Sequence, residues 1–410
     1  MRSTTSSIGP DSRYAWTRLI IAMAIGTIGN GGMWIVSVAL PPVQAEFGVT
    51  RADASLPYTL TLLGFAFGGV LMGRLSDRFG IMLPLLIGTT SIGLGYIAAG
   101  MSGSLWQFSL AQGVFIGLLG SSATFGPLIA NTSLWFEKRR GIAVALVSSG
   151  NYLAGAIWPP VVQYFFDTVG WRTTYIGFGV FSVLAMLPLA LMLRGRPPAH
   201  SAVGTPLVDR VPAINSIGIT SNQLLVMLAV AGVACCVAMS MPQVHIVAYC
   251  ADLGYGAARG AQMLSIMLGL GLISRLATGW ISDRIGGLRA LLVGTSLQGL
   301  ALLLFIPFDG LASLYLISAL FGLVQGGIVP AYAMIVREYF SPREAGAKVG
   351  IVLMSTLLGM AFGGWMSGKI FDVTGSYDAA FANGVAWNVL NLCIVGWLLR
   401  RRARTMAMAA

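Results

Sequence analysis

The sequence predicts an all-α membrane protein in which twelve transmembrane helices form two pseudo-symmetric six-helix bundles. A scarcity of charge, a set of long apolar runs and an internal repeat predict this fold class. Charged residues make up 10% of the 410 residues and hydrophobic residues make up 56%, whereas about 25% of the residues of a soluble protein are charged. So few charges could not cover the surface of a soluble fold of this length.

The apolar runs are long enough to cross a membrane, because about 20 helical residues span a hydrocarbon layer of roughly 30 Å. We expect spans at about 17–39, 54–73, 82–100, 104–134, 141–165, 173–193, 222–248, 259–281, 289–307, 310–336, 346–370 and 380–399. None of these runs alternates apolar and polar residues, which excludes an outer-membrane β-barrel. Backbone hydrogen bonding within lipid then requires helices.

The positions of the basic residues predict the orientation. With the N-terminus inside, nearly all of the 25 Lys and Arg residues fall in inner loops and tails, and the outer side holds Arg51, Arg172, Arg259 and Lys369. This bias predicts a multi-pass protein of the cytoplasmic (inner) membrane with both termini in the cytoplasm. The formal net charge of +11 is therefore a topology signal, and we expect no nucleic-acid partner.

An internal repeat divides the expected spans into two sets of six. Residues 73–80 (GRLSDRFG) recur as residues 279–286 (GWISDRIG), and FDTVG at 166–170 recurs as FDVTG at 371–375. A repeat with the same orientation in both halves is typical of two fused bundles.

The longest expected inner loop supplies the boundary between these halves, because it carries Pro, Gly, Ser and charge. We therefore expect an N-terminal six-helix bundle at 1–193, a cytoplasmic linker at 194–221 and a C-terminal bundle at 222–410.

The repeated loop resembles the loop signature of the major facilitator superfamily. Further segments resemble the bacterial relatives of monocarboxylate transporters and oxalate:formate antiporters: EFGVTR at 46–51, WFEKRRG at 135–141, GWR at 170–172, and His245 seven residues before DLG at 252–254. The resemblance implies a secondary active transporter for a small organic anion that works by alternating access. It also implies that spans 1, 4, 7 and 10 line the central cavity.

Arg275 is the candidate substrate-binding residue, because it lies within the run 259–281 and an Arg at the centre of a span costs about 3 kcal/mol. Helical side chains lean toward their own N-terminus, so this guanidinium should point toward the membrane midplane. A guanidinium binds a carboxylate with a fixed fork of donors, and one positive charge suits a monocarboxylate. A tie to backbone carbonyls and snorkelling to the inner interface are the alternatives.

Further polar side chains lie within apolar runs and are expected to contact the substrate. They are Tyr332, Gln325, Asn30, Gln112 and Asn151. Each could instead bridge two helices, which is worth about 0.6 kcal/mol.

A co-transported proton is expected, because it removes the charge that an entering anion moves against the membrane potential. His245 and Asp252 are the candidate proton-coupling residues, since histidine titrates near neutral pH. A His at a helix interface and a carboxylate at an outer helix end are the alternatives.

The matching inner loops predict gating contacts. The candidates are Gly73, Asp77, Arg78, Asp283 and Arg284, together with Lys138, Arg139 and Arg140. The resemblance implies that each Asp approaches the start of a span in the opposite half, near Gly346 or Gly141, where the helix end carries positive potential. These residues could also be topology charges alone.

Other functional classes have weaker support. No metal-binding cluster, nucleophile pair or phosphate loop is present, so we expect no enzyme, no metal and no cofactor. We also expect a monomer. The four cysteines lie in or beside apolar runs and are expected to be small buried side chains. Proton-coupled drug efflux is the second interpretation, although no span supplies the deep acid that cationic ligands prefer. A membrane sensor on a transporter fold is the third.

Overall fold

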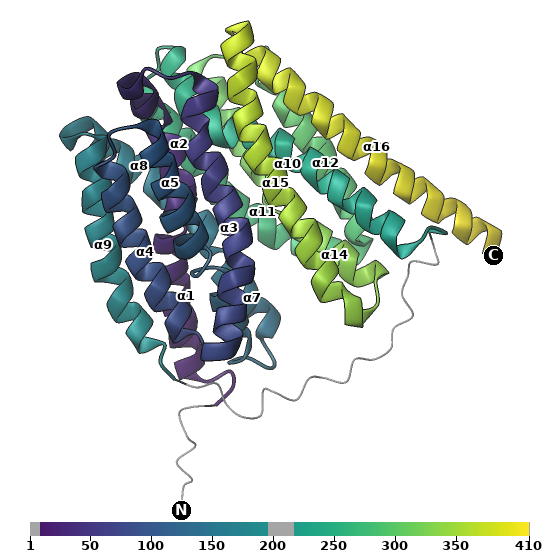
Figure 1. Ribbon diagram of the computed structural model, residues 1–410. Helices are drawn as coiled ribbons and strands as arrows, with labels where there is room; N and C mark the ends of the chain where they lie inside the picture. Colours follow the sequence, from purple (N-terminus) through teal and green to yellow (C-terminus); the bar gives the residue numbers. More distant parts are fainter. Residues whose placement is uncertain (1–8, 196–216, 410) are drawn as a thin grey trace, which may run out of the picture. The chain divides into compact units, whose positions relative to one another are not determined.

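The computed structural model describes residues 9–195 and 217–409, and this part of the chain is helical throughout, without a strand (Figure 1). The helices are α1 (Arg13–Gly29), α2 (Gly31–Phe47), α3 (Arg51–Phe79), α4 (Met82–Gly100), α5 (Leu105–Leu110), the π-helix η1 (Ala111–Ser121), α6 (Gly126–Ser133), α7 (Arg140–Ser148), α8 (Gly150–Val169), α9 (Trp171–Met192), α10 (Ser221–Asp252), α11 (Ala257–Ile285), α12 (Gly287–Leu304), α13 (Leu311–Gln325), α14 (Ile328–Tyr339), α15 (Pro342–Thr374) and α16 (Tyr377–Ala409).

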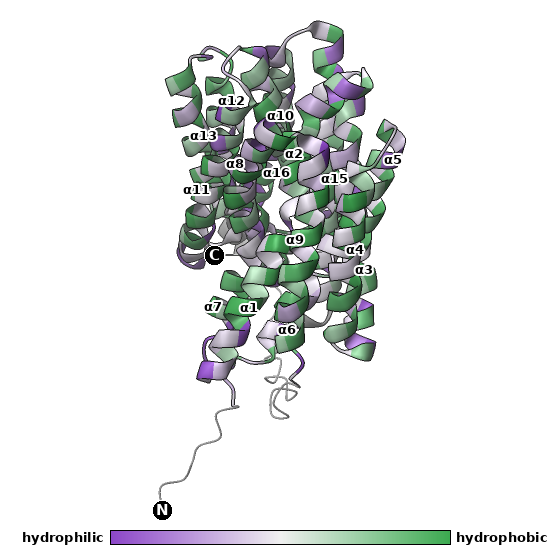
Figure 2. Ribbon diagram, turned by 90° about the vertical axis from the view of Figure 1, so that its left-hand side faces the viewer, coloured by the Kyte–Doolittle hydropathy of each residue, from purple (hydrophilic) through white to green (hydrophobic). Residues whose placement is uncertain are grey.

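These helices form 12 stretches in the described residues that are long and apolar enough to cross a membrane. Each overlaps one of the runs expected from the sequence, so the predicted set of spans is confirmed. Most of the stretches are longer than the apolar runs, because the helices continue into more polar residues. Figure 2 shows apolar residues along the helices and hydrophilic residues gathered toward helix ends.

Some spans are interrupted within the membrane-length stretch. The first bends at Asn30, which ends α1 and precedes α2. The fourth passes from α5 into η1 and then α6. Glycines of η1 lie against α3: a Cβ on Gly117 would come within 3.0 Å of the Thr61 backbone, so the two helices can touch only because that side chain is absent. Such π-helical segments within α-helices often occur at functional sites.

The described contacts divide the chain into two compact units. The first comprises Met1–Ala39 and Leu60–Pro206, and the second comprises Leu40–Thr59 and Leu207–Ala410. The division therefore falls inside α2 and α3, and the helical hairpin at 40–59 packs with the second unit. The bundle boundaries expected from the repeat stay a prediction, because a repeat unit and a contact-based unit need not coincide.

In the first unit, α4 packs along α9 and η1 (Figure 1). Close approach comes from Gly93 and Gly179, whose added Cβ atoms would each meet the other's carbonyl oxygen. Aromatic rings fill the space beside them: Tyr96 lies 4.8 Å from Phe178 and 5.5 Å from Tyr175, measured between ring centroids.

In the second unit, α10 is the central helix and contacts α11, α15 and α16. Every residue from 234 to 250 is buried, as expected for a helix that is apolar on all sides. Gly359 and Gly363 of α15 approach the α10 backbone at Val233 and Val237, and such small residues let membrane helices pack closely.

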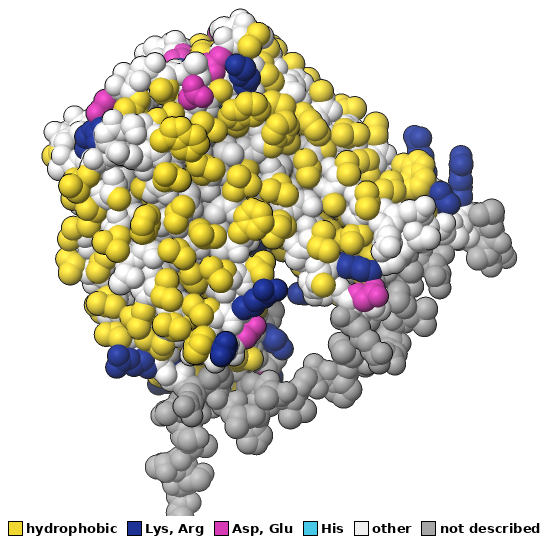
Figure 3. Space-filling view, viewed as in Figure 1, with side chains coloured by type: hydrophobic (Ala, Val, Ile, Leu, Met, Phe, Trp, Pro, Cys, Tyr) yellow, Lys and Arg dark blue, Asp and Glu magenta, His cyan; other side chains and the backbone are white. Residues whose placement is uncertain are grey.

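The helix flanks that are left exposed are apolar. Leu184 is 69% exposed and Leu316 is 62% exposed. Figure 3 shows hydrophobic side chains over the helices, with Lys, Arg, Asp and Glu near the helix ends. This distribution is the one that a surface in contact with lipid requires.

Candidate functional site

Arg275 lies on α11 and is half-buried, next to the buried Ser274. The helix around it packs closely on α13, because a Cβ on Gly326 would overlap the carbonyl oxygen of Gly271. Arg275 is one turn along α11 from Gly271, and Gln325 directly precedes Gly326. The structure therefore brings these two predicted residues near the same helix crossing.

Gln325 forms a buried pair with Gln243 of α10. The Gln243 Nε2 donates to the Gln325 Oε1 over 2.5 Å, and both side chains are almost fully buried. The Gln243 Oε1 and the Gln325 Nε2 have no hydrogen-bond partner among the residues that the structure describes. If the O and N atoms of both amides were exchanged, one amide oxygen and one amide nitrogen would still lack a partner. The pair therefore offers one amide nitrogen as donor and one amide oxygen as acceptor to a ligand.

Gln243 was not among the residues expected from the sequence. The available signal was an amide within the run 222–248, directly after Pro242. That signal alone could not separate a ligand contact from an interhelical bond, and the pairing with Gln325 required the fold.

Tyr332 is fully buried in α14 and is tied to two neighbouring helices. Asn391 of α16 donates through its Nδ2 to the Tyr332 hydroxyl, and also to the carbonyl of Ala231 on α10. The hydroxyl therefore takes part in an interhelical bond, which was the alternative for this residue.

The predicted residues of the first unit are also engaged in hydrogen bonds. The Asn30 Nδ2 donates to the Gly26 carbonyl over 2.7 Å, and its Oδ1 is buried without a hydrogen-bond partner in the described part of the chain. The Gln112 Nε2 donates to the Tyr175 hydroxyl over 2.9 Å. The Asn151 Oδ1 accepts from the indole of Trp34 over 3.1 Å. These bonds join helices within this unit or close the break after α1.

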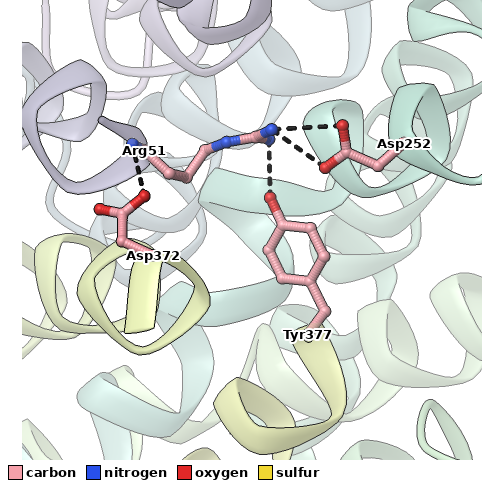
Figure 4. Close-up of polar contacts among 4 residues, drawn as sticks. All are labelled: Arg51, Asp252, Asp372 and Tyr377. Carbon is pink, nitrogen blue, oxygen red and sulfur yellow. Dashed lines mark hydrogen bonds and ion pairs between the residues drawn. The ribbon is translucent and has the colours of Figure 1, made fainter. Parts of the chain in front are cut away.

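Asp252 and His245 belong to one cluster in the second unit. Figure 4 shows Asp252 together with Arg51, Tyr377 and Asp372. Both Asp252 oxygens accept from the Arg51 Nη2, at 3.0 and 3.2 Å, and the Arg51 Nη1 donates to the Tyr377 hydroxyl over 2.8 Å. The His245 ring lies 5.9 Å from the Tyr377 ring, and its Nε2 is 2.8 Å from the Gly364 carbonyl. Within 9–195 and 217–409, no group hydrogen-bonds to its Nδ1. The two proton-site candidates are therefore linked through Tyr377, which contacts the His245 ring and accepts from the Arg51 guanidinium that also binds Asp252.

Asp372 of α15 holds the beginning of α3 in the same cluster. Its two carboxylate oxygens accept from the backbone N–H groups of Arg51 and Ala52, each over 2.8 Å. A carboxylate is well placed there, because the first N–H groups of a helix have no partner within it. The Arg51 guanidinium also stacks on the rings of Phe371 and Tyr377.

The sequence indicated part of this arrangement. Phe371 and Asp372 belong to the repeated FDxxG segment, whereas Arg51 was counted only as an outer charge and Tyr377 was not considered. In the first unit, the repeat partner Asp167 instead accepts from Gln163, one turn earlier on its own helix.

The predicted gating residues lie at exposed helix ends and loops. Asp77, Arg78, Asp283 and Arg284 are exposed, and the Arg284 guanidinium lies 3.6 Å from the Trp280 ring centroid. The side chains of Lys138, Arg139 and Arg140 are exposed as well, and Gly73 is partly exposed.

The backbone of the basic loop is bound by Asp11, a contact not foreseen from the sequence. The Asp11 carboxylate accepts from the N–H groups of Glu137, Lys138 and Arg139, at 3.0–3.2 Å. Burial raises the pKa of the Asp11 carboxyl, but these three donors and the Arg139 charge outweigh that effect, so the pKa is lower than usual.

One expectation about the cysteines is corrected. Cys235, Cys236 and Cys250 are buried, as expected, but Cys393 is exposed. It lies on α16, so an apolar run does not by itself imply burial within the protein.

Comparison with known proteins places the chain among transporters. Residues 22–318 and 279–408 match the family model described as Major Facilitator Superfamily. Monocarboxylate transporter 13 of Bos taurus is 25% identical over 91% of this chain and 86% of its own length. The Agnestins efflux protein AgnL12 of Paecilomyces divaricatus is 23% identical over 76% of this chain and 70% of its own.

A solved structure shows the same fold. The bacterial homologue of the human lysosomal transporter Spinster has a TM-score of 0.69, with 15% identity over 97% of both chains. At this identity the likeness concerns the fold alone.

Proposed function

Because the chain belongs to the Major Facilitator Superfamily, we propose that it is a secondary active transporter that moves a small organic monocarboxylate across the cytoplasmic membrane. Transport proceeds by alternating access, with a co-transported proton, in a monomer whose termini are both cytoplasmic. The observation that carries the substrate class is Arg275, a guanidinium on an apolar membrane-length helix, one turn from the point where Gly271 meets Gly326, the residue after Gln325.

In this proposal the substrate carboxylate binds Arg275 through two parallel hydrogen bonds. Such charge-assisted pairs are roughly twice as strong as neutral hydrogen bonds. The Gln325–Gln243 pair lies near the same helix crossing and offers one further donor and one acceptor. Asn30, Gln112 and Asn151 are proposed to contact the substrate as well, and Tyr332 holds α14 in place through Asn391.

The proton is proposed to bind in the cluster of His245 and Asp252. An anion that enters alone moves against the membrane potential, at about 2.3 kcal/mol per 100 mV, and one proton removes this term. Within the cluster Arg51 is the positive charge, while Asp252 and Asp372 are the negative ones. Breaking the contact between Arg51 and Asp252 would leave this carboxylate, 38% exposed, available to a proton.

Asp77, Arg78, Asp283 and Arg284 are proposed to act at the inner gate, with Gly73 one turn before Asp77 on α3. Asp11 occupies the backbone N–H groups of 137–139 and leaves the Lys138, Arg139 and Arg140 side chains exposed. Those side chains are therefore available to a carboxylate that approaches as the inner side closes.

Uptake into proteoliposomes tests the substrate class. Labelled monocarboxylates, dicarboxylates and cationic dyes are compared with and without an imposed pH gradient, for the wild type, Arg275→Gln and the control Arg289→Gln. Arg289 is an exposed basic residue on α12. We expect monocarboxylate uptake to fall by about tenfold or more in Arg275→Gln, because a hydrogen bond to a charged group contributes about 1.5–3 kcal/mol, and to persist in Arg289→Gln.

The same screen tests the second candidate, drug efflux, which the likeness to the Agnestins efflux protein favours. Transport of cationic dyes that persists in Arg275→Gln, without carboxylate uptake in the wild type, would overturn the monocarboxylate proposal.

A further inference from the structure

A groove of about 580 Å³ lies between the beginning of α10 and the end of α16. Its polar lining residues gather at one end, together with Ile219, and the other end is apolar. The polar side chains are Asn222, Gln223 and Arg401, and the apolar ones include Val226, Met227 and Trp397. Both helices belong to the same unit, and nothing in the transport cycle proposed above uses this groove.

The polar and apolar parts follow the same order on both helices. On α10 the amides lie in the first turn and Val226 and Met227 lie in the next turn, farther into the membrane-length stretch. On α16, Trp397 lies one turn before Arg401, again on the side of the membrane interior. One turn is about 5.4 Å, so the groove changes from polar to apolar over the depth that separates a lipid headgroup from its acyl chains.

Arg401 is held at the polar end of the groove. Its Nε donates to the Ile217 carbonyl over 3.1 Å and its Nη2 donates to the Gly218 carbonyl over 3.0 Å, while its guanidinium lies 5.1 Å from the Trp397 ring centroid. Neither hydrogen bond uses Nη1. The neighbouring Arg400 and Arg404 are exposed, so the positive charge at this end attracts an anion.

The apolar end selects the kind of anion. Val226 is 61% exposed and Trp397 is 42% exposed, and both lie on helices long and apolar enough to span a membrane. A soluble anion would leave these side chains uncovered, whereas a phospholipid covers them with its acyl chains. Trp is also the residue that favours the depth of the headgroups.

We propose that this groove binds one acidic phospholipid, with the phosphate at Arg401 and the acyl chains over Val226 and Trp397. The proposal depends on the membrane location of the chain and not on which substrate it transports.

Quenching of Trp fluorescence by brominated lipids tests the proposal on the purified full chain. The signal of Trp397 is the difference between each protein and its Trp397→Phe counterpart. We expect brominated phosphatidylglycerol to quench this signal at about fivefold lower mole fraction than brominated phosphatidylcholine, since a basic residue near an anionic surface contributes about 1 kcal/mol. Arg401→Gln should abolish the preference, Arg401→Lys should keep part of it, and the exposed control Lys369→Gln should keep all of it.

A second variant separates loss of the site from loss of folding. Val226→Phe fills the apolar end, keeps every charge, and is expected to weaken the quenching of Trp397 by both lipids. Equal quenching by the two lipids in the wild type, or a preference that survives Arg401→Gln, would overturn the proposal. If millimolar glycerol 1-phosphate removed the preference, the ligand would be a soluble anion and the proposal would be wrong. Full quenching of Trp397 in Val226→Phe would also overturn the proposal.

Discussion

The guanidinium of Arg51 lies 3.0 Å from the carboxylate of Asp252, although the two residues are 201 positions apart in the sequence. The contact joins the hairpin at 40–59 to α10 within the second unit. The Arg51 side chain is only 8% exposed, whereas that of Asp252 is 38% exposed. Removing the acid should therefore disturb this unit more than removing a surface ion pair would.

Asp252→Asn is expected to destabilise the second unit, because it leaves the buried Arg51 charge with the Tyr377 hydroxyl and aromatic rings as neighbours. Losing one partner of a fully buried pair costs about 3–5 kcal/mol, and the partial exposure of Asp252 reduces our expectation to about 2 kcal/mol. Thermal unfolding in detergent measures the change. The control is Asp378→Asn, which removes an exposed carboxylate next to Tyr377 at the beginning of α16. Equal melting temperatures for wild type and Asp252→Asn would show that the contact is not stabilising.

His245→Gln and Asp252→Asn are expected to lose uptake driven by a pH gradient while they keep exchange of substrate across the membrane. The reason is that exchange carries no net charge and needs no proton, whereas net uptake of an anion does. Counterflow and proton-driven uptake are measured in the same proteoliposomes. If both variants retain proton-driven uptake, neither residue is the proton site.

Most of the fold could be predicted from the sequence, because span length and charge bias depend only on the bilayer. The break at Asn30 and the π-helix η1 could not be predicted, since such irregularities depend on tertiary packing. Near the break Gly29 lies against Thr124, and in η1 Gly117 lies against Thr61. The extension of helices beyond the apolar runs was also missed, because polar residues continue a helix as readily as they end it.

The sequence identified single residues of the site but not which residues they pair with. A single polar residue in an apolar run, such as Gln325, is visible in the sequence, but its partner Gln243 lies 82 positions earlier and is identified only by packing. Arg51 was read as a topology charge because its partners, Asp252 and Asp372, come from far along the chain. Pairing of this kind depends on the tertiary fold and leaves no local pattern.

The Gln243–Gln325 pair allows a binding role to be separated from a structural one. Gln243→Met should destabilise the protein by about 1–3 kcal/mol, because it leaves a buried amide without its partner, whereas replacing both amides with Met is nearly neutral. We therefore expect the double variant to regain thermal stability but to show a raised KM for the carboxylate. A double variant with wild-type KM would mean that the pair only joins α10 to α13.

Gly326→Ala is expected to impair both stability and transport, since the added Cβ would overlap the Gly271 carbonyl oxygen and force α11 and α13 apart. Overpacking of this kind costs about 1–3 kcal/mol, and the displacement would shift Arg275, one turn away. Gly279→Ala is the matched control on α11, because nothing lies within 4 Å of its Cβ position. Melting temperature and uptake are measured together, and similar values for the two variants would contradict the close packing.

Asp11 is expected to stabilise the first unit at neutral pH and to lose this effect only in acid. Its pKa is lowered below the model-compound value of 3.8 by the N–H groups of 137–139 and by Arg139, against the opposing effect of burial. A carboxyl with a lowered pKa contributes stability above its unfolded pKa, and the contribution disappears as the pH falls through the folded value. The melting temperature of Asp11→Asn should therefore lie below that of the wild type by a constant amount between pH 5 and pH 8. This pH range lies about one to four units above the pKa of the carboxyl in the unfolded chain. The difference should shrink only below about pH 4, and a difference that already shrinks between pH 7 and pH 5 would contradict the anchoring of the basic loop by this carboxylate.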